Sequence, residues 1–222
     1  MPAHTVTLVR HGQTASSARL AYSGRSDIAL TDLGREQARE AARLLAGAGI
    51  DAVVSSPLIR ARDTAQAIAD ATGAPLRVDD RLTEVDYGPF EGLDRAGARE
   101  RIGAPFDAWR ADPFGSPVPG MEPLADALQR ACAATADALA AHAHPVIVGH
   151  QGILRIVLVA LGQMAGGDYF ATRLQEAQPL VVQAPALAQA RPDGGWAPPP
   201  PSSRSASVTI ATGPSTTNAS SA

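Results

Sequence analysis

Clusters of apolar residues alternate with helical patterns over most of the chain. Runs of β-branched and aliphatic residues predict strands at 5–10, 51–57, 75–78 and 145–150. Amphipathic patterns predict helices at 32–47, 58–71, 123–142 and from 151 onward. Two later segments, 171–177 and 179–184, are expected to form further strands. Strands and helices that alternate in this way are typical of βαβ units around a largely parallel sheet, which is an α/β fold.

The helix predicted through REQAREAARLLAG has a clear start and an apolar face. Thr31 is a favourable N-cap, because its hydroxyl can accept a hydrogen bond from a backbone N–H of the first turn. Leu33, Ala41, Leu44 and Leu45 are expected on one face of this helix.

The composition changes at about residue 186. Residues 1–185 carry the alternating pattern and are expected to form one domain. Residues 186–222 are rich in Pro, Ser, Thr and Gly, as in APPPPSSRSAS. This tail has too few apolar residues to offset the entropy cost of ordering, so it is expected to be disordered.

Composition and charge narrow the possible functions. The chain carries a net charge of -3 without a basic run, which argues against nucleic acid or membrane partners and favours a small soluble ligand. All 19 basic residues are arginine, which excludes lysine Schiff-base chemistry and a P-loop lysine. Cys132 is the only cysteine and no export signal precedes the first strand, so a cytoplasmic location is expected. No interface pattern indicates an oligomeric state.

Arginine and histidine stand at the ends of three predicted strands. LVR ends in Arg10 and His11, VVSSP leads to Arg60, and VIVG ends in His150. Ligands of open α/β sheets bind outside the carboxyl ends of the strands, so these side chains are expected to converge. Two arginines and two histidines in one crevice indicate an anionic ligand, which the N-termini of the following helices would also favour.

Five sequence elements occur in a characteristic order: LVRHGQT, SGRSDIALTDLGREQA, SSPLIRARDTA, RLTEVDYGPFEG and VGHQGILR. Together they resemble the histidine phosphatase superfamily, the phosphoglycerate mutase-like enzymes, from about residue 5 to 185. The resemblance implies a three-layer sandwich with a central, mostly parallel sheet flanked by helices. It also implies a metal-independent phosphomonoesterase that needs no cofactor and acts on a small phosphorylated metabolite.

The resemblance assigns a role to each catalytic position. His11 would be the nucleophile that forms a phosphohistidine, and neutral imidazole can serve near pH 7 without a metal. Arg10, Arg60 and His150 would surround the phosphoryl oxygens and stabilise the transition state. His150 helps most when protonated, and bound phosphate should raise its pKa. Glu84 would protonate the leaving oxygen and then activate water.

Further positions are expected to contact or shape the substrate site: Gly12, Thr14, Ser17, Ser23, Gly24 and Gln151. Gly12 allows a tight turn beside the phosphate, and its carbonyl can hold His11 in one tautomer. Thr14, Ser23 and Gly24 fit ordinary turn chemistry equally well. Many members of the family have asparagine in place of Ser17. Asp86 is the substitute acid if Glu84 points away from the site.

Two alternatives remain open beside the phosphatase. A cofactor-dependent phosphoglycerate mutase would use the same core, but such enzymes carry a longer insertion than the stretch from Glu84 to His150 allows. A non-catalytic protein that binds phosphorylated ligands would not need both a nucleophile and an acid. None of the motifs identifies the substrate, and no set of metal ligands is expected.

Overall fold

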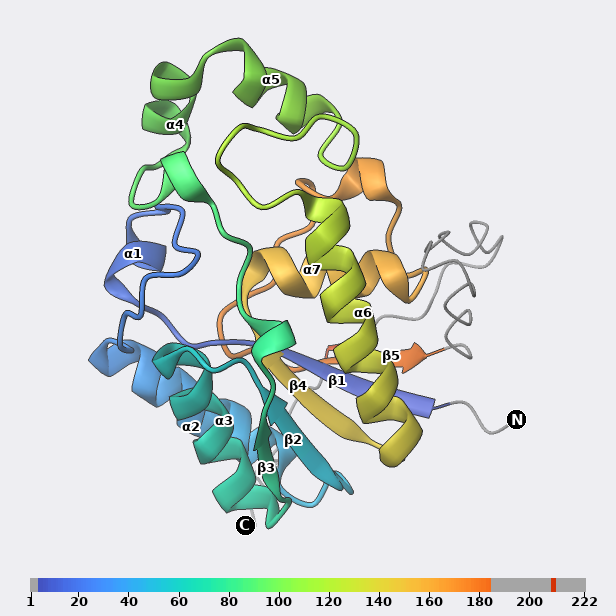
Figure 1. The fold of residues 1–222 in the computed structure, drawn as a ribbon. Coiled ribbons are helices and arrows are strands. Elements are labelled where there is room, and N and C mark those ends of the chain that lie inside the picture. The colour runs from blue at the N-terminus through green and yellow to red at the C-terminus, as the bar shows by residue number, and fades with distance from the viewer. Residues whose placement is uncertain (1–3, 185–208, 211–222) are drawn as a thin grey trace, which may run out of the picture.

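A sheet of six strands forms the middle layer of the molecule (Figure 1). The computed structural model describes residues 4–184 and 209–210. The strands are β1 (His4–Arg10), β2 (Ala52–Ser55), β3 (Leu76–Val78), β4 (Pro145–Gly149), β5 (Leu180–Ala184) and β6 (Thr209–Ile210). Their order is β3-β2-β4-β1-β5-β6; the first four are parallel, and β5 pairs antiparallel with β1 and β6.

Helices form the two outer layers and a separate upper part. The helices are α1 (Ala15–Ala18), α2 (Asp32–Leu45), α3 (Ile59–Thr72), α4 (Arg95–Ile102), α5 (Ala104–Ala111), α6 (Leu124–Ala141) and α7 (Gln151–Ala160). Short 3-10 turns are η1 (Asp80–Leu82), η2 (Gly88–Phe90) and η3 (Gly166–Asp168). The pair α2 and α3 covers one face of the sheet, α6 and α7 cover the other, and α4 and α5 lie apart from the sheet (Figure 1). Within the described residues, no helix has the length and apolarity needed to cross a membrane.

The central strands are apolar on both sides because helices cover both faces. Successive side chains of a strand point to opposite faces. In β1, Leu8 packs into the cluster with α6 and α7, whereas Val9 packs into the cluster with α2 and α3. In β4, Ile147 and Val148 divide in the same way. The expected α/β sandwich with a mostly parallel sheet is therefore confirmed.

The start of α2 agrees with the sequence, but one position on its face does not. Thr31 Oγ1 accepts a hydrogen bond from the Gly34 backbone N–H at 3.0 Å, so the predicted N-cap is confirmed. Leu45 is buried as expected, whereas Leu33 is 48% exposed, and its assignment to the buried face was wrong. Gly34 occupies the core-facing position of the first turn, and its neighbour Leu33 lies about 100° around the helix from it.

Of the two late strands, only the second is present. Residues 179–184 were expected as a strand and contain β5, whereas the strand expected at 171–177 was wrong. That segment makes one isolated bridge, from Arg10 to Glu176. Ala177 has a φ of 51°, a left-handed conformation that cannot continue an extended strand.

The tail and three short helices also differ from what the periodicity alone predicts. Most of the tail that was expected to be disordered, residues 186–222, lies outside the described residues. Its described part, Thr209–Ile210, forms β6 beside β5. The helices α1, α4 and α5 were not predicted from periodicity, because none is longer than 8 residues.

The loop after β1 lies directly against the first turn of α2. The Thr31 backbone N–H donates to the Gln13 carbonyl at 2.9 Å. A Cβ on Gly34 would overlap the Gln13 carbonyl oxygen, and a Cβ on Gly12 would overlap the Gly34 carbonyl. The two backbones therefore approach more closely than any side chain permits, which fixes this loop on α2.

We expect Gly34→Ala to destabilise the fold by about 1–3 kcal/mol, because the added methyl must push two backbones apart. Gly167→Ala is the matched control, since a Cβ there meets no atom within 4 Å, and its effect should stay within about 0.5 kcal/mol. Urea unfolding of both variants measures the difference. Equal stability of the two variants would show that the close approach is not a constraint.

Candidate active site

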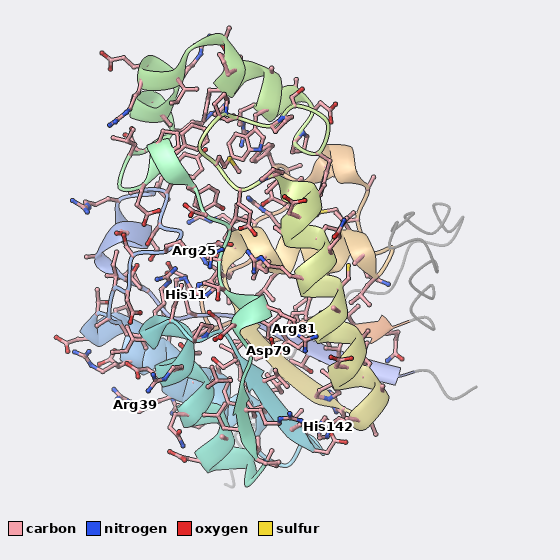
Figure 2. All side chains as sticks on the ribbon, in the orientation of Figure 1. His11, Arg25, Arg39, Asp79, Arg81 and His142 are labelled. Atoms are coloured by element: carbon pink, nitrogen blue, oxygen red, sulfur yellow. The ribbon has the colours of Figure 1, made fainter. Side chains whose placement is uncertain are left out.

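The catalytic side chains expected from the sequence meet at the carboxyl ends of neighbouring strands. Arg10 and His11 stand at the end of β1, and His150 is the N-cap residue of α7 after β4. Arg60 lies in the first turn of α3, after β2, and Glu84 follows η1, beyond β3. The strand order β3-β2-β4-β1 brings these ends side by side. Figure 2 shows His11 near the middle of the molecule, between the lower helices and the upper part.

Four of these side chains, those of Arg10, His11, Arg60 and Glu84, line a cavity of about 270 Å³, whereas His150 does not. The expected site residues that line it are Arg10, His11, Thr14, Ser17, Ser23, Arg60, Glu84 and Gln151. His150 is fully buried beside His11, with the two ring centroids 5.1 Å apart. Gly12 and Gly24 do not line the cavity, and they contribute through their backbones instead.

His11 is held as a neutral imidazole with one free nitrogen. Its Nδ1 lies 2.7 Å from the Gly12 carbonyl, which can only accept, so Nδ1 carries the hydrogen and Nε2 has a free lone pair. Burial lowers the pKa of His11 well below its usual value, and the charges of Arg60 and Arg10 lower it further. The backbone N–H of Gly12 donates to Thr64 Oγ1 at 3.1 Å, which anchors the turn.

Arg60 is a buried guanidinium that organises the loop before α2. Its side chain is 1% exposed. One terminal nitrogen donates to the Ser26 carbonyl at 2.7 Å, and the other donates to the carbonyls of Ser23 and Gly24 at 3.2 and 3.0 Å. Gly24 therefore acts as an acceptor for Arg60, and its backbone N–H donates to Glu91 at 2.8 Å.

His150 uses both ring nitrogens inside the protein. Arg60 Nε donates to His150 Nδ1 at 3.1 Å, and His150 Nε2 lies 2.7 Å from Ser56 Oγ. Since Nδ1 accepts, Nε2 carries the hydrogen and the ring is neutral. Burial and the charge of Arg60 are the main reasons that its pKa lies well below the usual value. The rise in the pKa of His150 that is expected when phosphate binds stays a prediction.

Arg10 is anchored at two of its three nitrogens. Nη1 donates to Gln151 Oε1 at 3.2 Å and to the Leu174 carbonyl at 3.1 Å, and Nη2 pairs with Glu176 at 3.4 Å. Its Nε is buried and has no partner among the described residues. The segment around residues 174–176, expected as a strand, instead wraps over this guanidinium.

Glu84 lies on the N-terminus of α7 and points into the cavity. Its carboxyl oxygens accept hydrogen bonds from the Gly152 and Ile153 backbone N–H groups at 2.8 and 2.9 Å. Burial raises the pKa of Glu84, and this effect outweighs the backbone hydrogen bonds that act in the opposite direction. The substitute acid is not needed, because the Asp86 carboxylate accepts from the Gly88 N–H instead.

Thr14 and Ser17, which were expected to contact substrate, also stabilise the start of α1. Thr14 and Ser17 form a capping box: Thr14 Oγ1 accepts from the Ser17 N–H at 3.1 Å, and Ser17 Oγ accepts from the Thr14 N–H at 2.9 Å. Ser17 thus lines the cavity with a hydroxyl that the cap already holds. Ser23 Oγ differs, because it is buried without a partner among the described residues.

A charged clamp that sequence reasoning missed holds the loop of Glu84. Arg130 of α6 donates to the carbonyls of Thr83 and Glu84 at 2.5 and 3.3 Å. It also pairs with Glu122 at 2.7 Å, and Glu122 accepts from the Asp86 N–H at 3.0 Å. The available signal was the one arginine on the helix LADALQRACAATADALAA, most of whose other residues are apolar or small.

A metal site was not expected from the sequence. In residues 4–184 and 209–210, no cluster of three or more His, Cys, Asp or Glu side chains could hold an ion. His142 and His144, at the end of α6, do not line the active-site cavity. His144 Nε2 is 3.0 Å from Thr7 Oγ1.

Comparison with known sequences gives one family. Residues 6–184 match the family model of the histidine phosphatase superfamily (branch 1). The 2-carboxy-D-arabinitol-1-phosphatase of Triticum aestivum is 34% identical over 174 residues, 78% of this chain and 35% of that protein. A 2,3-bisphosphoglycerate-dependent phosphoglycerate mutase of Rhizobium etli is 40% identical over 128 residues, 55% of this chain and 61% of that protein. The chain thus spans less than two thirds of the length of these relatives.

The fold is also shared with solved structures. The structure of mycobacterial glucosyl-3-phosphoglycerate phosphatase in complex with VO3 aligns with a TM-score of 0.73 and 30% identity. This alignment covers 81% of this chain and 91% of that one. The match over residues 6–184, together with this shared fold, shows that the chain belongs to the histidine phosphatase superfamily (branch 1).

Proposed function

We propose that this chain is a metal-independent phosphomonoesterase that hydrolyses a small phosphorylated metabolite through a phosphohistidine on His11. The observation that carries the proposal is that a neutral His11 and Glu84 line the same cavity, together with several arginines. Members of the family named above act as phosphatases on small phosphorylated compounds, which supports the same class of substrate here.

The protonation states of the two groups support acid-assisted attack. With ordinary pKa values, a histidine would be protonated and a glutamate ionised in weakly acidic solution, and both would be in the wrong form. Burial lowers the pKa of His11 and raises that of Glu84. The shifts therefore widen the pH range in which a free nucleophile and a proton donor coexist.

In the first step, the Nε2 lone pair of His11 attacks phosphorus as the bond to the leaving oxygen breaks. Glu84 gives its proton to that oxygen, so the product leaves as a neutral alcohol. Charge on the three remaining phosphoryl oxygens is stabilised by Arg10 and Arg60, which line the cavity as fixed positive groups.

In the second step, water attacks the phosphohistidine. The Glu84 carboxylate takes a proton from that water, the bond between phosphorus and Nε2 breaks, and inorganic phosphate is released. His11 returns as the neutral imidazole, because the Gly12 carbonyl keeps the hydrogen on Nδ1 throughout.

Two buried polar groups support an oxyanion in this cavity. Arg10 Nε and Ser23 Oγ belong to residues that line it, and neither atom has a hydrogen-bond partner among the described residues. Buried polar groups in proteins are almost always paired, so phosphoryl oxygens are the expected partners of these two atoms.

Phosphoglycerate mutase is the second candidate, because a mutase is among the relatives. The stretch between Glu84 and His150 is shorter than such enzymes carry, and this favours hydrolysis. A non-catalytic binding protein is disfavoured, since binding alone requires neither a free Nε2 nor a carboxyl with a raised pKa. Conversion of 3-phosphoglycerate to its isomer without phosphate release would identify the mutase.

We expect phosphate release from p-nitrophenyl phosphate to be unchanged by EDTA and lost in His11→Ala, by at least about a thousandfold. His142→Ala, at the far end of α6 (Figure 2), is the matched control and should retain activity. An acid-labile, alkali-stable phosphoryl group should be trapped on the wild-type protein and on no His11→Ala sample. Loss of activity with EDTA would contradict the metal-independent reaction.

Glu84→Gln should separate the two steps according to the leaving group. Glycerol 1-phosphate needs a proton on its leaving oxygen, so its hydrolysis should fall by about 10²–10⁴. p-Nitrophenolate leaves without a proton, so rapid mixing should show a fast first turnover followed by a stalled phosphoenzyme. In the wild type, hydrolysis of glycerol 1-phosphate should slow as pH rises through the raised pKa of Glu84. An equal loss of the first turnover with both compounds would remove Glu84 as the acid.

Arg130→Met should make Glu84 a poorer proton donor, because it releases the loop that carries Glu84. Arg130 does not line the cavity, so substrate contacts are not removed directly. We expect hydrolysis of glycerol 1-phosphate to fall by roughly tenfold to a hundredfold, with a smaller loss for the first turnover of p-nitrophenyl phosphate. Arg62→Met, an exposed arginine of α3, is the control. A uniform loss with both compounds would indicate general destabilisation instead of positioning.

A further inference from the structure

The cavity is far more positive than the chain as a whole. The protein carries a net charge of -3, yet five arginines and a single carboxyl group line this one cavity. Arg10 and Arg60 adjoin His11. The remaining three, Arg95, Arg155 and Arg173, are contributed by α4, α7 and the segment before β5. We call these three residues the rim arginines.

The rim arginines have no carboxylate partner. None of them forms an ion pair with a described Asp or Glu, although other arginines of the chain do. Arg95 and Arg173 are exposed and make no side-chain hydrogen bond with the described residues. Their positive charges are therefore available to a ligand.

Arg155 is the most fixed of the three. Its Nε donates to the Thr172 carbonyl at 2.6 Å, and its guanidinium carbon lies 5.4 Å from the centre of the Tyr169 ring. The two terminal nitrogens have no partner among the described residues. This half-buried guanidinium is already oriented by one hydrogen bond and one ring. Binding an anion at its two free nitrogens therefore costs little side-chain entropy.

The rim arginines adjoin the phosphoryl site. Gln151, the first residue of α7, accepts from Arg10 at 3.2 Å, and Arg155 lies one helical turn further, about 6 Å along the axis. Burial lowers the pKa of Arg10, and the nearby charges of Arg173 and Arg155 also lower it, while Glu176 and Glu84 oppose them. Like charges this close repel one another until an anion binds among them.

We propose that the rim arginines bind a second anionic group of the substrate, so that the preferred substrates are phosphomonoesters with a further carboxylate or phosphate on a short carbon skeleton. This inference rests on the proposed function and deepens it. Scission occurs at His11, and the second anion lies beside Arg155 and Arg173, about one helical turn away. Arginine suits this role because its planar fork of donors matches the oxygens of carboxylate and phosphate alike.

The test compares substrates that differ only in the second anion. The pairs are 3-phosphoglycerate with glycerol 1-phosphate, phosphoserine with phosphoethanolamine, and fructose 1,6-bisphosphate with fructose 6-phosphate. For each pair, kcat/KM of the doubly anionic member is divided by that of its partner. The first two pairs report a carboxylate and the third reports a phosphate, so the source of the second anion is identified.

We expect the wild type to favour a doubly anionic member by about tenfold or more, and Arg155→Gln or Arg173→Gln to remove most of this preference. Arg155→Lys should keep part of it, since it retains the charge without the planar fork. Arg39→Gln is the control, because this exposed arginine lies on the outer side of α2, away from His11 (Figure 2), and the ratio should not change.

A wild-type ratio near one for all pairs, or a ratio that neither glutamine variant alters, would overturn the proposal. If Arg155→Gln has a low Tm, Arg173→Gln decides alone, since that side chain is exposed and unpaired among the described residues. Failure to release phosphate from every compound, p-nitrophenyl phosphate included, would reject the proposed function instead. In that case, calorimetry measures the binding of 3-phosphoglycerate and glycerol 1-phosphate. Tighter binding of 3-phosphoglycerate supports a second-anion site at the rim arginines, and equal Kd values overturn it.

Discussion

The buried guanidinium of Arg60 is the group on which the rest of the site depends. A buried charge must be compensated, and in this chain backbone carbonyls and a neutral His150 do so in place of a carboxylate. These bonds hold the loop around Ser23 against α3. Arg60 forms no ion pair with a described Asp or Glu. Its charge therefore adds to the effect of burial in lowering the pKa of His11, and it leaves the cavity attractive to phosphate.

Glu84, the proposed acid on the other side of the cavity, is held from two directions. The N-terminus of α7 binds the carboxyl group of Glu84, and Arg130 of α6 binds the backbone around it. Both helices pack on the same face of the sheet, so Glu84 is fixed relative to the strand that carries His11. Such support matters because acid catalysis requires the proton donor to lie within hydrogen-bond distance of the leaving oxygen.

The upper part of the molecule closes the cavity without catalytic groups of its own. Phe90 and Trp109 are buried and pack with Tyr22, which lines the cavity, and the buried Phe106 packs on Phe90 and Trp109. This aromatic cluster holds α4 and α5 over the site and brings Arg95 to its rim. The part of the cavity wall that differs most from a regular α/β sandwich therefore also carries one of the rim arginines.

The sequence alone determined the α/β sandwich, the four parallel strands and the groups at their ends, because strand and helix periodicity is local and parallel strands direct their carboxyl ends to one edge. It did not determine the exposure of Leu33, the irregular path of residues 171–177, the neutral state of His150 or the clamp of Arg130. Each of these depends on groups distant in the chain: a backbone that displaces a side chain, a guanidinium that needs acceptors, or burial that shifts a pKa. Only the tertiary structure brings such partners together, so only it could decide them.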